Sequence, residues 1–128
     1  MWLLSACGGG GSSPAPTAKL PLSELDMLRT QIAQQEQHVR ALAVDSPCDS
    51  HAECRMVAID PQTGCATPAA LPYSLRSTDI LQLGNAAFDL TLLKQRLWIQ
   101  ENPNTVCPAV IYPLPNAICV NTRCVAGP

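Results

Sequence analysis

The segment Cys48-Asp49-Ser50-His51-Ala52-Glu53-Cys54 opens the cysteine-rich part of this chain and restricts how the rest of it can fold. Four further cysteines follow: Cys65, Cys107, Cys119 and Cys124. Thiols at this density form disulfides in an oxidising compartment or hold a metal ion in a reducing one. Thiolate and imidazole ligands suit zinc. The candidate ligands for a zinc ion are Cys48, His51, Cys54 and Cys65. Whether the compartment is oxidising or reducing therefore decides between disulfides and a metal site.

The first residues of the chain indicate an exported protein. Leu4-Ser5-Ala6-Cys7 resembles the lipobox of bacterial lipoproteins, in which a leucine and two small residues precede the cysteine that ends the signal peptide. The resemblance implies that Cys7 carries a diacylglyceryl group and is the first residue of the mature protein. Only Trp2-Leu3-Leu4 represents the apolar stretch of about 7–15 residues in a full signal. Either the signal is unusually short or translation starts further upstream, and we expect the second.

These features divide the chain into three parts. We expect residues 1–6 to be a signal-peptide remnant, residues 7–20 to be the lipidated cysteine with a flexible Gly/Ser/Pro linker, and residues 21–128 to be a disulfide-bonded domain. Apart from the covalent lipid on Cys7, we expect no cofactor. Gly8 follows Cys7 where an Asp would resemble an inner-membrane retention signal. The expected location is the bacterial cell envelope, at the outer membrane, facing the periplasm or the surface.

The number of cysteines agrees with this interpretation. Seven cysteines leave one unpaired, and lipidation of Cys7 removes the odd one. The other six then form three disulfides, and we expect no metal site. Six cysteines can pair in many ways, and spacing does not choose among them. We expect the strand at Cys54 to be linked to the C-terminal hairpin, and Cys65 and Cys107 to bracket the second helix.

Hydrophobic periodicity predicts a small disulfide-rich α+β domain with two main helices, at about residues 23–43 and 78–101. In the first, Ser23 is the expected N-cap, and apolar positions recur three and four apart: Leu25, Leu28, Ile32, Gln35, Val39 and Leu42. The stripe favours either a partner-binding coiled coil or a helix lying on its own domain. It is too short for a stable coiled coil, so we expect the second arrangement.

The second helix is expected to be the buried central one, because apolar residues occupy more than one of its faces. Ser77 or Thr78 is the expected N-cap, with Asp79 in the first turn complementing the helix dipole. Gly84, in mid-helix, is expected to allow close approach of another backbone.

The remaining segments predict short antiparallel β-structure. Strands are expected at 54–59, 110–112 and 117–120, with a turn at 60–64 that contains Gly64. If Asn121-Thr122 is a two-residue turn, Cys119 and Cys124 face each other across a hairpin.

Charge and motifs exclude several functions. The net charge is −2, and the Lys and Arg residues are scattered, so nucleic acid is not expected as a partner. His38 and His51 lack a nucleophile and an acid at useful spacing. Although Asp49, Ser50 and His51 contain the residue types of a catalytic triad, adjacent side chains point in different directions. We expect no enzymatic activity.

The spacing of the six cysteines is similar to that of small exported cysteine-rich proteins of proteobacteria, a resemblance that brings no function with it. The leading hypothesis is a non-catalytic envelope module, anchored in the membrane by lipid, that binds another envelope protein. The alternative is an inhibitor of an exogenous hydrolase, either a lysozyme or a protease. Its disulfide-braced loop, such as 110–116, would enter the active site, and preorganisation favours such binding.

Overall fold

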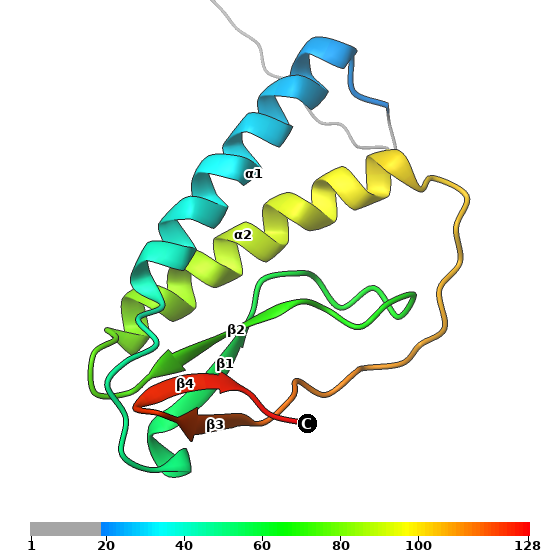
Figure 1. The fold of residues 1–128 in the computed structure, drawn as a ribbon. Helices are drawn as coiled ribbons and strands as arrows, with labels where there is room; N and C mark the ends of the chain where they lie inside the picture. The colour runs from blue at the N-terminus through cyan, green and yellow to red at the C-terminus, as the bar shows by residue number, and fades with distance from the viewer. Residues whose placement is uncertain (1–18) are drawn as a thin grey trace, which may run out of the picture.

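The computed structural model describes residues 19–128, which form two long helices packed on the first of two small antiparallel sheets, with the second sheet lying against the first (Figure 1). In chain order the elements are α1 (Leu22–Leu42), the 3-10 turn η1 (His51–Glu53), β1 (Cys54–Ala58), β2 (Ala70–Ser74), α2 (Ile80–Glu101), β3 (Ala117–Val120) and β4 (Arg123–Ala126). The predicted small disulfide-rich α+β domain is thus confirmed. Residues 1–6, Cys7 and most of the expected linker lie outside the described residues.

The core forms where the two antiparallel helices meet the first sheet (Figure 1). Val39 of α1 packs with Leu83 and Leu90 of α2, and Ile59 closes the cluster from the end of β1. Each of these four side chains is at most 3% exposed. Burying an aliphatic side chain of this size contributes about 1.5–3 kcal/mol, so the helix pair is a major source of stability.

The polar residue in the stripe of α1 takes part in the same contact. Gln35 donates from Nε2 to the carbonyl oxygen of Ala86 on α2, at 3.0 Å. A partly buried amide at a core position therefore has a hydrogen-bond partner. The expectation that α1 lies on its own domain is confirmed, because α2 covers the stripe.

Both predicted N-caps are wrong. α1 begins one residue earlier than expected, with Pro21 as N-cap, and the Pro21 carbonyl accepts from the N–H groups of Glu24 and Leu25. The extended backbone of Pro21 suits this position, so Ser23 falls inside the first turn.

α2 begins at Ile80, and its N-cap is Asp79, whose carboxylate accepts from two N–H groups of the first turn. The Thr78 hydroxyl is used elsewhere. It accepts from the Val44 N–H and donates to the Val44 carbonyl, which fastens the end of α1 to the start of α2.

α2 is not buried on all sides. Its inner face contains Leu83, Ala86, Ala87 and Leu90, whereas Leu81 is 75% and Phe88 62% exposed. Gly84 lies on the exposed side, and a Cβ built there meets nothing within 4 Å. The predicted close approach at Gly84 is therefore wrong.

The two sheets are separate hairpins. β1 pairs with β2 in the register Cys54↔Ser74 to Ala58↔Ala70. Strand β2 was not expected, because Pro72 interrupts its short apolar run; its pairing with β1 decides its conformation. The other hairpin agrees with expectation: Cys119 faces Cys124, and the turn residues Asn121 and Thr122 both have positive φ.

Three disulfides connect these elements: Cys48–Cys119, Cys54–Cys124 and Cys65–Cys107. The expected links between Cys54 and the C-terminal hairpin, and between Cys65 and Cys107, are both present. The first two bonds each span about 70 residues of chain. On loop-closure grounds a bond of that span stabilises the folded state by about 4 kcal/mol.

Candidate functional site

The most distinctive exposed feature is the segment from Cys107 to Asn116, here called the braced segment. It lies between α2 and β3 and runs along one side of the molecule without forming a helix or a strand (Figure 1). It contains Pro108, Pro113 and Pro115. Proline fixes its own φ and restricts the preceding residue to extended backbone, so the sequence itself favours an extended conformation here.

Three successive contacts fasten the braced segment to the loop of residues 60–68. Cys65 is disulfide-bonded to Cys107. The backbone of Gly64 lies against the carbonyl of Pro108. Gln62 binds Tyr112 with both ends of its amide. The segment is therefore held by a covalent bond, a close backbone contact and a pair of hydrogen bonds.

Gly64 is required by the geometry of this contact. Its φ is +86°, and a Cβ at this position would collide with the carbonyl oxygen of Pro108. Any larger residue would both strain the loop and push the braced segment away. The sequence shows that a glycine stands in this turn, but it does not show that Pro108 packs against it.

The predicted strand at 110–112 is absent: within residues 19–128 no neighbouring strand pairs with this stretch, the Val110 N–H donates to the Pro108 carbonyl, and Tyr112 is bound by Gln62. The Gln62 Nε2 donates to the Tyr112 carbonyl at 2.8 Å, and its Oε1 accepts from the Tyr112 N–H at 3.1 Å. These two bonds, here called the Gln62 clamp, imitate those that one residue of an antiparallel strand would supply. A side chain has thus taken the place of a neighbouring strand, and no sequence pattern indicated this role for Gln62.

Lys94 of α2 holds the base of the loop. Its ammonium lies 2.8 Å from Asp60 and 3.0 Å from Glu36 of α1, and only 18% of the side chain is exposed. Asp60 also accepts from the Ala69 N–H across the loop. The braced segment is in this way connected through the loop to both helices.

The pKa values of the two carboxylates bound to Lys94, those of Glu36 and Asp60, are both lowered. Hydrogen bonds from Lys94 and Arg40 lower the pKa of Glu36. Partial burial alone would raise the pKa of Asp60, but hydrogen bonds from Lys94 and the Ala69 N–H outweigh it and lower the pKa below its ordinary value. Both groups stay ionised at neutral pH.

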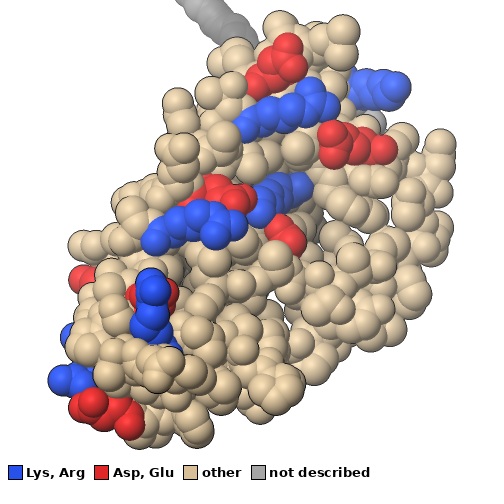
Figure 2. All heavy atoms as spheres, viewed as in Figure 1, with Lys and Arg blue, Asp and Glu red and all other residues tan. Residues whose placement is uncertain are grey.

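The surface beside this cluster is nearly uncharged. Figure 2 shows charged side chains along the helices and at one end of the molecule, with a flank free of them. The braced segment contains no Asp, Glu, Lys or Arg. Ile111 is 80% and Val110 44% exposed, so the segment presents aliphatic side chains to solvent.

One hollow adjoins the loop of residues 60–68, and another adjoins the end of the braced segment. The first, of about 270 Å³, lies between the loop and the C-terminal end of α2 and is lined by residues that include Pro61, Pro68 and Trp98. The other, of about 570 Å³, includes His51 and Leu114. The exposed walls of both hollows are more apolar than polar, although Asp60, Lys94 and Glu101 also line the first.

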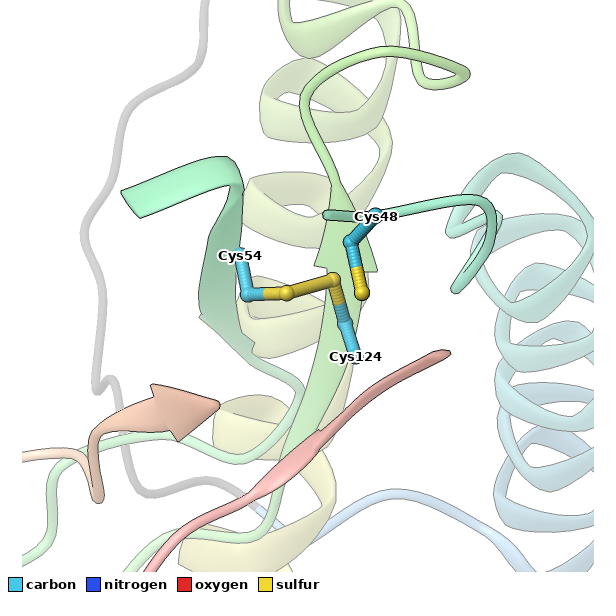
Figure 3. A group of neighbouring side chains, drawn as sticks. All are labelled: Cys48, Cys54 and Cys124. Atoms are coloured by element: carbon cyan, nitrogen blue, oxygen red, sulfur yellow. A yellow bond between two sulfur atoms is a disulfide. The ribbon is translucent and has the colours of Figure 1, made fainter. Parts of the chain in front are cut away.

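The structure brings together two cysteines of the alternative zinc set, Cys48 and Cys54, but not the third, Cys65. The sulfurs of Cys48, Cys54 and Cys124 lie within 4.8 Å of one another in a buried cluster (Figure 3). All three belong to disulfides. Cys65 is bonded to Cys107 instead of joining this cluster.

The two histidines lie apart and have different surroundings. His51 accepts the N–H of Cys119 at Nδ1, at 2.8 Å, which joins η1 to β3. His38 lies on the exposed side of α1. Within residues 19–128 neither imidazole is hydrogen-bonded to a carboxylate.

Comparison with protein-family models, with curated proteins and with solved structures found no match. Neither α1 nor α2, the long helices of residues 19–128, is apolar enough over its length to span a bilayer.

Gly64→Ala and Gly84→Ala form a matched pair that tests the loop contact. Gly64→Ala should lower the free energy of unfolding by at least about 2 kcal/mol, because the new Cβ collides with Pro108 at a positive φ. Gly84→Ala should raise it by about 0.5–1 kcal/mol, since the position is helical and open. Urea unfolding measures both; equal effects at the two sites would contradict the proposed contact.

The ion-pair cluster predicts a pH dependence. Carboxylates with lowered pKa stabilise the fold above their ordinary values of 3.8 and 4.5, and this stabilisation is lost as pH falls through the lower, folded-state pKa. Lys94→Met should cost about 1 kcal/mol at pH 7, because both partners are partly solvated. It should also flatten the loss of stability from pH 5 to 2.

Thermal unfolding monitored by circular dichroism across that pH range measures this effect. The control is Arg96→Met, which removes an exposed cation from the same helix. An unchanged acid profile in Lys94→Met would show that the cluster does not stabilise the loop.

Proposed function

We propose that this protein is a non-catalytic binding module of the bacterial cell envelope, lipid-anchored through Cys7 and docking on another envelope protein. The observation that carries the proposal is the braced segment. It is an exposed, uncharged stretch fixed on a rigid frame by a disulfide and by the Gln62 clamp. Binding residues concentrate on loops that a rigid scaffold positions, and preorganisation reduces the entropy lost on binding.

The pairing of the cysteines supports the lipid anchor. Each of the six cysteines within residues 19–128 is disulfide-bonded to another of them. Cys7, the seventh, therefore has no thiol among those six to pair with, as expected of a lipidated residue. Disulfides also persist in the oxidising compartments to which lipoproteins are exported. We place the protein at the outer membrane, facing the periplasm or the surface.

The alternative function, inhibition of an exogenous hydrolase, has specific support from the same segment. Its residues 110–116 were the expected inhibitory loop. The disulfide at Cys107 and the clamp on Tyr112 hold this stretch at two points, with Ile111 exposed between them. An inhibitor is a binding module whose partner is an enzyme, so the two functions differ in the partner and share the surface.

Removing the acyl acceptor tests the anchor. Full-length Cys7→Ser should move from the membrane to the soluble fraction, because several acyl chains on one residue supply the membrane affinity. Its circular dichroism spectrum and unfolding midpoint should match those of the detergent-solubilised parent. A Cys7→Ser protein that stays with membranes, together with a free thiol among the other six cysteines, would contradict the proposal.

Capture from detergent-solubilised envelope tests the docking function. The tagged full chain should retain a partner in stoichiometric amount. The double variant Cys65→Ala/Cys107→Ala should lose it, because the braced segment is then released at one end. The control Gly84→Ala should retain the partner. If the released segment captures the same protein equally well, docking does not use this surface.

A further inference from the structure

We infer that the braced segment enters the active-site cleft of an endopeptidase as a substrate-like strand, with Ile111 in an apolar specificity pocket. The inference rests on the proposed binding function and names the class of its partner. It is carried by the side chain, the backbone and the tethering of three consecutive residues, Val110, Ile111 and Tyr112.

The side chain of Ile111 is the most prominent apolar group of the braced segment. It is 80% exposed, and its neighbour Val110 is 44% exposed. The segment carries no charge. A single aliphatic side chain projecting from an uncharged stretch suits an apolar pocket of matching size. The charged and hydroxyl-rich surfaces that glycan-cleaving enzymes use do not need such a group.

The backbone of the segment is bound at Tyr112 and unbound at Ile111. Gln62 binds the N–H and the carbonyl of Tyr112. The Val110 N–H donates to the Pro108 carbonyl across a bend at Ala109, and the next backbone groups along the chain are the N–H and carbonyl of Ile111. Within residues 19–128 they have no hydrogen-bond partner. Endopeptidase clefts bind peptides as an added strand through such groups.

The tethering explains why the segment would inhibit such an enzyme and resist release. Cleavage of the Ile111–Tyr112 bond adds one water and leaves an Ile111 carboxylate and a Tyr112 amine. The Ile111 side is held through the Cys65–Cys107 disulfide, and the Tyr112 side by Gln62 and by strand β3. Neither new end can diffuse away, so the reverse reaction, which expels the water, competes with release.

The test uses the full chain carrying Cys7→Ser and three endopeptidases, which cleave after aliphatic, aromatic and basic residues. The first should be inhibited most strongly. Ile111→Asp should weaken that inhibition about 100-fold, because a charge would enter an apolar pocket. Val106→Asp is the control: this residue is 93% exposed and precedes the braced segment, and the variant should inhibit like the parent.

A change of specificity makes the test sharper. Ile111→Lys should transfer inhibition to the enzyme that cleaves after basic residues, because only the pocket residue has changed. Gln62→Ala should make the chain a better substrate, with cleavage between Ile111 and Tyr112 detected by mass spectrometry under reduction.

Absence of inhibition by the parent chain, together with no gain by Ile111→Lys, would overturn the inference. Inhibition of lysozyme by the parent chain, abolished in Ile111→Asp, would likewise replace the endopeptidase with a glycosidase. Either result leaves the proposed function standing if envelope capture still depends on the Cys65–Cys107 disulfide. Loss of that dependence would overturn the proposed function itself.

Discussion

The disulfide between Cys54 and Cys124 joins the first strand of one sheet to the last strand of the other, and both residues are at most 3% exposed. The two sheets are separate hairpins with no hydrogen-bonded strand shared between them. The neighbouring Cys48–Cys119 bond connects the loop that follows α1 to the C-terminal hairpin of β3 and β4. Figure 3 shows the first of these bonds with the sulfur of Cys48 beside it. Together the two cross-links hold the C-terminal hairpin, where the braced segment ends, in place.

Cross-links of this kind matter because the apolar core is small. Six buried residues form the main cluster between the helices and the first sheet, whereas several large side chains of α2 remain exposed. A folded domain is typically stable by about 5–15 kcal/mol, and each long-range disulfide contributes a sizeable part of that amount. The hairpin and the braced segment have few apolar contacts of their own and rely on these bonds.

A series of local contacts connects the helices to the braced segment and fixes its conformation. The helices hold Lys94, Lys94 holds Asp60, and the loop that follows contacts the braced segment through Gln62, Gly64 and Cys65. Each contact uses a different interaction: an ion pair, paired hydrogen bonds, a close backbone approach and a covalent bond. The result is an exposed, uncharged stretch whose conformation is fixed by the folded domain; because such preorganisation lowers the cost of binding, we propose this stretch as the docking surface.

The sequence by itself determined the two helices and the C-terminal hairpin, because these depend on local periodicity and turn residues. Helix starts were mispredicted because Thr78 bonds Val44 and Pro21 serves as cap. Strand β2 and the Gln62 clamp were not visible, because both depend on partners far along the chain. Only the tertiary structure decided which cysteine of the hairpin pairs with Cys54 and which with Cys48, and how the braced segment is held, since both depend on how distant segments meet in space.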